Sequence, residues 1–296
     1  MTREAASAPR LFCFGLGYSA RVLAARLGAR GWRIAGTTRA AEAVAELARA
    51  GIEAFAFDRD RPLEAPGAAL AGTTHILSSV PPDAEGDPVL DCHGADIARL
   101  PGLAWAGYLS TTGVYGDRGG GWVDEDSALE PTGDRGRRRL AAERAWLALR
   151  RDHGVPVHLF RLAGIYGPGR NALESLRAGT ARRIDKPGQV FSRIHVEDIA
   201  TALEASIARP NPGRAYNLCD DDPAPPEEVI AHACALLGVE PPPLIPFEAA
   251  ELSPMARSFY RDNKRVSNRR IKDELGVELA YPDYKAGLKA LLATGR

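Results

Sequence analysis

The fold of this chain is decided near its start, by the segment Leu11-Phe12-Cys13-Phe14-Gly15-Leu16-Gly17-Tyr18-Ser19-Ala20. The four apolar residues that open it indicate a short buried strand, and Ala and Leu recur at helical spacing over Ser19–Arg30. A GxGxxA turn joins the two. Gly15 permits a tight turn, Gly17 lets another group approach the backbone, and Ala20 is small enough for helix–strand packing. The segment therefore predicts a strand–turn–helix unit with an accessible backbone.

Short apolar runs and helical stretches then alternate along the chain. Further strands are predicted at Trp32–Thr38, Ile52–Phe57, His75–Val80, Ala104–Ser110 and Val155–Leu162, and further helices at Ala40–Ala50 and Gly136–Arg151. Alternation at this spacing is typical of βαβ units and a parallel sheet. We therefore predict an α/β fold with a doubly wound parallel sheet of the Rossmann type.

The pattern changes after Gly167. The proline-rich stretches Pro223–Pro226 and Pro241–Pro246 predict linkers or surface loops, with a helix of about Glu227–Leu237 between them. The last part of the chain is predicted to be mainly helical. Its clearest signal is Ser267-Asn268, which predicts the start of a helix that runs to Leu275 and ends at Gly276.

Two domains are expected from this change of pattern. A Rossmann domain comprises residues 1–166 plus about 189–220, and a small substrate-side domain comprises about 167–188 plus 221–296. Residues Met1–Pro9 are expected to form a loose tail.

The composition argues against several classes of protein. Lys plus Arg and Asp plus Glu each number 38, so the net charge of zero favours neither nucleic acid nor an anionic membrane as partner. The first residues contain no apolar signal-peptide region, and no stretch reaches the roughly 18 apolar residues of a membrane span. We therefore expect a cytoplasmic protein. We also expect no metal site, because no metal-ligand spacing relates the cysteines. Their thiols should be reduced and mostly buried: Cys13, Cys92, Cys219 and Cys234.

The glycine-rich turn predicts that the chain binds a dinucleotide. The N-terminus of the following helix offers free N–H groups and a partial positive charge to a diphosphate. The expected contacts are Gly15, Gly17, Tyr18, Ser19 and Ala20.

The end of the second strand predicts which dinucleotide is bound. An NAD enzyme usually has a carboxylate there to bind the ribose 2′-hydroxyl, but this chain has Thr37-Thr38-Arg39. Arg39 and the threonine hydroxyls, Thr38 among them, suit a 2′-phosphate, so NADP(H) is preferred over NAD(H). The alternative is that Arg39 is a solvated residue at a helix start.

Four further segments resemble the extended short-chain dehydrogenase/reductase family, the NAD(P)-dependent epimerases and dehydratases of nucleotide sugars and similar substrates. They are Ser110–Gly116 (STTGVYG), Arg161–Gly169 (RLAGIYGPG), Arg193–Ala200 (RIHVEDIA) and Ala215–Leu218 (AYNL). The resemblance runs from Leu11 to about Cys219. It implies a seven-stranded sheet and a substrate-side domain built largely from the C-terminal part.

The chain departs from this family at the acid/base pair. The family has Tyr-x-x-x-Lys followed four residues later by Glu, and Glu143 aligns with that Glu, which puts Arg135 at the tyrosine position and Arg139 at the lysine position. An arginine stays protonated and accepts no proton, so the ordinary mechanism is lost or its acid/base comes from elsewhere. The departure resembles atypical members of the family, which keep the cofactor site but lack the pair.

The resemblance also implies contacts to the cofactor. Asp58 falls at the adenine-contacting position, although a surface loop is an equal alternative. Arg139 can hydrogen-bond the nicotinamide ribose, and the segment Ser78, Ser79 and Val80 is expected to pass near the ribose and nicotinamide.

Catalytic and substrate-binding roles fall on a few further residues. Thr111 stands at the catalytic Ser/Thr position and polarises a substrate carbonyl or else bonds local backbone. Tyr115 supplies a substitute phenol, contacts substrate or packs, and Tyr166 contacts substrate or packs. Arg135 and Arg170 are expected near an anionic group of the substrate, with a solvated helix start as the alternative for Arg135.

Two functions remain open from the sequence. One is an NADP(H)-dependent oxidoreductase or epimerase-like enzyme acting on a small polar, sugar-like or anionic molecule, which the Thr111 segment and the glycines favour. The other is a non-catalytic NADP(H) sensor or regulatory protein, which the missing pair favours. We favour the enzyme. A homodimer through the apolar helix Leu140–Leu149, with Trp146, is an alternative to packing that helix in the core.

Overall fold

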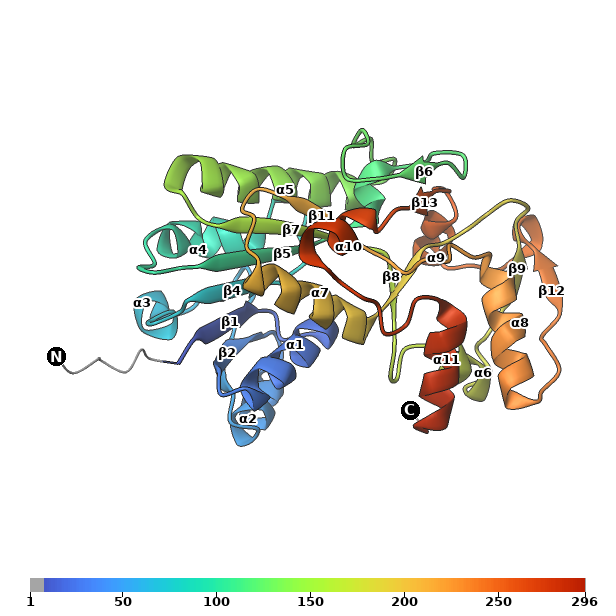
Figure 1. Cartoon of the computed structure of the whole chain (residues 1–296), viewed down its shortest axis with the longest axis horizontal. Helices are drawn as coiled ribbons and strands as arrows, with labels where there is room; N and C mark the ends of the chain where they lie inside the picture. The colour runs from blue at the N-terminus through green and yellow to red at the C-terminus, as the bar shows by residue number, and fades with distance from the viewer. Residues whose placement is uncertain (1–7, 296) are drawn as a thin grey trace. The chain divides into compact units, whose positions relative to one another are not determined.

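The computed structural model describes residues 8–295 of the chain. Its largest sheet has seven strands in the order β11-β7-β5-β4-β1-β2-β3 (Figure 1). The strands are β1 Arg10–Phe14, β2 Arg33–Thr38, β3 Glu53–Ala56, β4 His75–Ser78, β5 Trp105–Thr111, β7 Val157–Leu162 and β11 Ala215–Leu218. The strand pairs are parallel, which confirms the doubly wound α/β fold. The strand order reverses between β1 and β4, the point at which such sheets bind ligands.

The predicted helices of this part are present, and two helices, α3 and α4, are additional. The helices are α1 Tyr18–Ala29, α2 Ala41–Arg49, α3 Pro66–Ala69, α4 Pro88–Ala98, α5 Asp134–His153 and α7 Val196–Ala208. The sequence analysis missed α4, although its start carries a signal. The Asp87 carboxylate accepts the N–H groups of Val89 and Leu90, and Pro88 occupies the first helical position.

The described residues form two compact units. The first comprises residues up to Ser110 with Ala141–Phe160 and Ser206–Ala215, and the second comprises Thr111–Leu140, Arg161–Ala205 and the chain from Tyr216 onward. These bounds differ from the predicted domain boundaries near residues 166, 188 and 220. The two units are compact parts of the structure, so the division into folding domains stays a prediction.

The second unit contains short strand pairs and small helices. β8 Gly164–Tyr166 pairs with β10 Arg193–His195, β9 Arg183–Asp185 with β12 Leu244–Pro246, and β6 Trp122–Val123 with β13 Arg265–Val266. The helices are α6 Ala172–Arg177, α8 Pro226–Leu237, α9 Pro254–Phe259, α10 Arg269–Leu275 and α11 Tyr284–Ala293, and two 3₁₀ turns are η1 Thr112–Tyr115 and η2 Phe247–Ala249. Helices α6, α8 and α11 pack side by side around one apolar cluster (Figure 1).

Two local expectations in this unit were wrong. The second proline-rich stretch is not a loop throughout, because its last three residues form β12, an edge strand that tolerates proline. Helix α10 ends at Gly276 in the left-handed conformation, as predicted, but Asn268 makes no side-chain cap. Its amide instead donates to the Cys219 carbonyl at 2.9 Å and the Asp221 carboxylate at 2.6 Å.

Helix α5, for which the sequence left a dimer interface and core packing open, contributes its tryptophan to the core. Trp146 is fully buried, stacks on Tyr108 and donates its Nε1–H to the Asp87 carboxylate at 3.0 Å. The alternative of an intramolecular core is therefore correct for Trp146. The thiols are mostly buried, as expected, with Cys92 half-buried.

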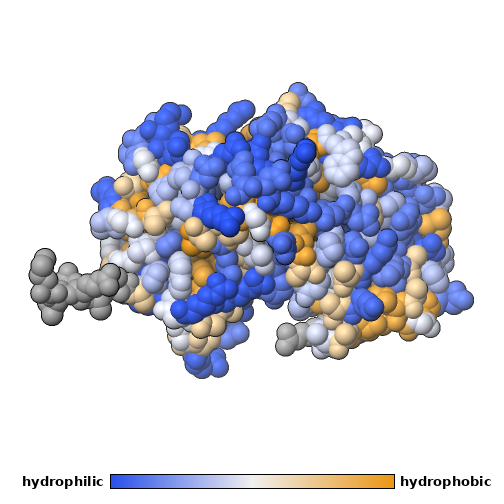
Figure 2. Space-filling model, viewed as in Figure 1, coloured by the Kyte–Doolittle hydropathy of each residue, from blue (hydrophilic) through white to orange (hydrophobic). Residues whose placement is uncertain are grey.

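Two observations concern surface and hydropathy. Figure 2 shows mostly hydrophilic side chains on the viewed face, with apolar ones gathered at its lower right over the C-terminal end of α8, where Val239 is 48% exposed. Over the stretch from residue 8 to residue 295, no helix has both the length and the hydropathy needed to cross a membrane. The expected tail lies, as far as residue 7, outside the described residues.

Candidate functional site

The glycine-rich turn after β1 is held from both neighbouring strands. The Gly15 N–H donates to the Thr37 hydroxyl at 2.9 Å, and the Ser79 hydroxyl donates to the Gly15 carbonyl at 2.5 Å. Gly15 has a φ of +85°, and a Cβ there would lie 2.8 Å from the Ser79 oxygen. Only glycine fits this position without strain. The turn thus links the carboxyl ends of β1, β2 and β4, where the strand order reverses.

The N-terminus of α1 is open at Gly17. Gly17 is the N-cap residue, no side chain caps this helix end, and its first turn carries no acidic residue. A Cβ added to Gly17 would meet no atom within 4 Å. Ser19 and Ala20 are buried beneath the turn, while Tyr18 is half-buried. The exposed backbone and the positive end of the helix dipole can therefore receive a diphosphate.

Two arginines, Arg39 and Arg61, lie at the end of β2. Arg39 is exposed and Thr38 half-buried, but Thr37 is 1% exposed. The Thr37 hydroxyl is engaged by Gly15, so the expectation that both threonine hydroxyls face a 2′-phosphate was wrong for Thr37. The Arg61 guanidinium donates to the Arg39 carbonyl at 2.7 Å. The sequence analysis missed Arg61.

Asp58 and its neighbour Arg59 belong to two different ion-pair groups. The Asp58 carboxylate pairs with Arg61 at 2.9 Å. Arg59 binds Asp83 through two hydrogen bonds, of 2.6 and 2.9 Å, and Asp91 through one of 2.8 Å. The Arg59 guanidinium lowers the pKa of Asp83 to about 2. Arg59 therefore joins the segment after β3 to the segment after β4.

Of the three residues predicted near the cofactor at the end of β4, only Ser79 and Val80 lie next to the glycine-rich turn. Ser79 bonds Gly15, and the Val80 side chain would lie 3.3 Å from a Cβ on Gly15. Ser78 is completely buried, so its side chain faces the interior of the protein. Val80 is half-buried.

In the second unit, Thr111 is the last residue of β5 and caps the turn η1. Its hydroxyl oxygen accepts the Gly113 N–H at 3.1 Å, the local backbone role that the sequence left open. The hydroxyl proton remains available to donate to a carbonyl. The turn is packed closely against the start of α5, since a Cβ on Gly136 would lie 2.7 Å from the Gly113 oxygen.

Neither tyrosine expected near the substrate presents a free phenol. Tyr115 is fully buried, its hydroxyl donates to Asn217 at 2.7 Å, and Arg161 donates to it at 3.0 Å. Burial raises the pKa of Tyr115 to about 12. Tyr166 is 7% exposed, and its hydroxyl donates to the Asp283 carbonyl at 3.3 Å. This geometry argues against proton transfer by Tyr115 and favours the packing role for both residues.

Arg135 in the second unit is exposed to the like charges of two other arginines. Partial burial, and then the like charges of Arg139 and Arg170, lower the pKa of Arg135. The Arg135 guanidinium carbon lies 5.3 Å from the centre of the Phe259 ring. Within the described residues, no carboxylate oxygen lies within 4.0 Å of Arg135. The charge of Arg135 can therefore attract an anion.

Glu143, on which the alignment of Arg135 and Arg139 depends, is buried in the first unit. Its carboxylate accepts the Ser110 hydroxyl at 2.5 Å. This contact fixes α5 to the end of β5, one residue before Thr111.

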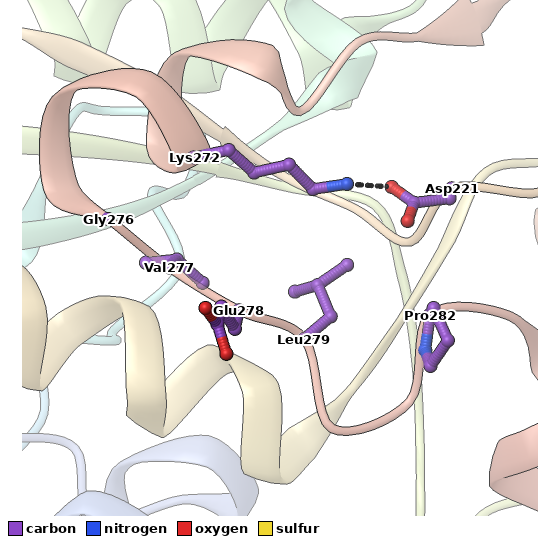
Figure 3. Close-up of a pocket in the computed structure, with 7 residues that line it drawn as sticks. All are labelled: Asp221, Lys272, Gly276, Val277, Glu278, Leu279 and Pro282. Carbon is purple, nitrogen blue, oxygen red and sulfur yellow. Dashed lines mark hydrogen bonds and ion pairs between the residues drawn. The ribbon is translucent and has the colours of Figure 1, made fainter.

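A pocket in the second unit contains none of the predicted site residues (Figure 3). It has a volume of about 390 Å³ and is lined by Asp221, Lys272, Gly276, Val277, Glu278, Leu279 and Pro282. The Lys272 ammonium lies 2.5 Å from the Asp221 carboxylate, so these charges satisfy one another. The pocket therefore does not change which residues we assign to the candidate site.

Comparison with known proteins finds a known family domain in the chain. Residues 96–219 match the model of the NAD dependent epimerase/dehydratase family. The chain is also 28% identical over 285 residues to Protein YeeZ of Escherichia coli strain K12, covering 91% of this chain and 95% of that protein. Residues 96–219 are thus an NAD-dependent epimerase/dehydratase domain. The chain as a whole is YeeZ-like, as the resemblance predicted.

Solved structures agree with the fold. The chain is 53% identical to a conserved protein of unknown function from Silicibacter pomeroyi DSS, with a TM-score of 0.90 and coverage of 97% of this chain and 99% of that one. The dTDP-glucose 4,6-dehydratase of Bacillus anthracis, solved with NAD, shares the fold at 15% identity, with a TM-score of 0.76 and coverage of 97% and 96%. Family and fold together support an oxidoreductase- or epimerase-like function.

Proposed function

We propose that this chain is an NADP(H)-dependent oxidoreductase or epimerase-like enzyme that acts on a small anionic or sugar-like molecule without the family's Tyr-x-x-x-Lys pair. The observation that carries the proposal is the open helix end at Gly17, beside a turn that Thr37 and Ser79 hold in place. Such a helix end binds a diphosphate through its N–H groups. A bound nicotinamide supplies a hydride, and the protein supplies orientation and charge.

The preference for NADP(H) rests on positive charge at the end of β2. Arg39 is exposed there, and Arg61 is in contact with it through the Arg39 carbonyl. A phosphate binds an arginine through charge-assisted hydrogen bonds, whereas the 2′-hydroxyl of NAD offers no charge. Thr38 adds a half-buried hydroxyl. Cofactor contacts are also proposed for Asp58, Ser79, Val80 and Arg139.

Substrate recognition is assigned to residues of the second unit. Arg135 and Arg170 are proposed to attract the anionic group, and Thr111 to donate its hydroxyl proton to a carbonyl. Because an arginine accepts no proton, Arg135 has a binding role in this account and no acid/base role.

A non-catalytic NADP(H) sensor is the second candidate, and one observation favours it. The phenols of Tyr115 and Tyr166, which are the substitute groups considered above, are both buried and hydrogen-bonded. A sensor needs the cofactor site but no proton donor.

The two candidates are separated by following the fluorescence of protein-bound NADPH while small carbonyl compounds that carry a carboxylate are added. The enzyme proposal expects oxidation that falls at least tenfold in Thr111→Val and in Arg135→Gln. Oxidation unaffected by both changes would contradict the assigned residues. Tight NADPH binding without oxidation by any compound would favour the sensor.

A further inference from the structure

Helix α9 exposes two large apolar side chains. Met255 is 70% exposed and Phe259 is 49% exposed. They are four residues apart, so they lie on the same face of the helix. The Ser253 hydroxyl accepts the Ala256 N–H at 3.2 Å and fixes the start of the helix. The pair therefore forms an ordered apolar face, which we call the α9 face.

The α9 face adjoins a cation. The Arg135 guanidinium carbon lies 5.3 Å from the Phe259 ring centre, a distance at which a cation interacts with an aromatic ring. Roughly half of the Phe259 side chain is still exposed beside this contact. An apolar group placed against Phe259 would therefore be close to a positive charge.

The charge of Arg135 is not balanced by a nearby acid. Its neighbour Arg137 pairs with Asp134 at 2.5 Å, but within the part of the chain that the structure describes no carboxylate pairs with Arg135. The additional positive charges of Arg139 and Arg170 act on it. An anion would relieve this like-charge repulsion.

We propose that Arg135 and the α9 face bind a small aromatic carboxylate, whose carboxylate pairs with Arg135 while its ring packs on Phe259 and Met255. The 5.3 Å between the Arg135 guanidinium carbon and the Phe259 ring centre favours a ligand whose charge and ring are directly joined or one atom apart. A nucleotide matches poorly, since a ribose separates its base from its phosphate. The inference rests on the proposed function only for the claim that this ligand is the substrate.

The test uses the full chain without cofactor and ligand-observed NMR titrations with sodium benzoate and sodium acetate. Benzoate is expected to bind about tenfold more tightly than acetate. Phe259→Ala is expected to weaken benzoate about three- to tenfold and to leave acetate unchanged, as the loss of one aromatic contact predicts. Arg135→Gln should weaken both ligands, whereas the matched variant Arg137→Gln, whose arginine already has a carboxylate partner, should change neither.

The proposal is overturned if benzoate binds no better than acetate, if neither binds, or if Phe259→Ala leaves benzoate binding unchanged. Uridine monophosphate binding more tightly than benzoate would overturn this preference for a short separation of charge and ring. An NADPH titration of the same samples separates this site from the proposed function. Benzoate binding without NADPH binding would support the anion site and contradict the proposed enzyme. NADPH binding without benzoate binding would contradict the anion site alone.

Discussion

The hydroxyl of Tyr115 donates a 2.7 Å hydrogen bond to the side-chain oxygen of Asn217. Asn217 belongs to β11, and the same hydroxyl accepts a hydrogen bond from Arg161 on β7. Tyr115, which follows Thr111 by four residues, is therefore part of a buried polar network that joins the turn η1 to two strands. Its position explains why a tyrosine is present here without any need for proton transfer.

Tyr115→Phe is expected to lower the free energy of unfolding by about 1–2 kcal/mol, because the buried Asn217 oxygen loses its hydrogen-bond donor and Arg161 loses one of its acceptors. Affinity for NADPH should stay the same, as should the pH profile of any turnover. Urea denaturation and NADPH titration measure the two effects. A Tyr115→Phe variant with the stability of the wild type but without turnover would instead indicate that Tyr115 takes part in the reaction.

The two glycines of the turn should respond differently to alanine. Gly17→Ala places a methyl group in open space, so the unfolding free energy should change by about 1 kcal/mol or less, while NADPH affinity falls at least tenfold because the diphosphate can no longer approach. Gly15→Ala strains a backbone of φ +85° and should cost about 1–3 kcal/mol in stability. Calorimetric melting and NADPH titration of both variants check the contrast. Unchanged NADPH affinity in Gly17→Ala would contradict the cofactor site.

The stability of the protein should depend on pH through Asp220. Asp220 is 1% exposed, and its Oδ2 has no hydrogen-bond partner in the chain from residue 8 to residue 295. Burial raises its pKa from 3.8 to about 8. The folded state therefore favours the protonated form, and the contribution of Asp220 to stability is greatest below pH 3.8 and falls as the pH rises to about 8.

Asp220→Asn removes this titration. The variant should gain stability relative to the wild type as the pH rises from about 4 to about 8, with no further gain above that. Urea denaturation at a series of pH values measures the difference. Parallel pH dependences of the two proteins would show that Asp220 is ionised in the folded state at neutral pH.

The sequence predicted the sheet because its signals are local. The apolar run before Gly15 and the helical spacing after it suffice to place β1 and α1 within a residue or two. The short pairs of the second unit lack such signals. Trp122 and Arg265 pair in β6 and β13, although they are far apart in the chain and each strand has two residues.

The candidate site divides in the same way. The position of Gly17 followed from the spacing of the glycines, but the hydrogen bond of Arg61 to Arg39 depends on the course of the chain after β3. The contact between Arg135 and Phe259 joins the start of α5 to α9, and no periodicity in the sequence relates the two. Burial of the Tyr115 phenol was likewise not visible, since its partners lie on β7 and β11.

The central claim is that the chain binds NADP(H) at the glycine-rich turn and recognises the 2′-phosphate through Arg39. The most direct test is a fluorescence titration of the purified protein with NADPH and with NADH, repeated for Arg39→Ala and for the exposed α2 residue Arg49→Ala as matched control. The account predicts that NADPH binds more tightly than NADH, that Arg39→Ala removes most of this difference, and that Arg49→Ala keeps it. Failure of the wild-type protein to bind either nucleotide would contradict the account.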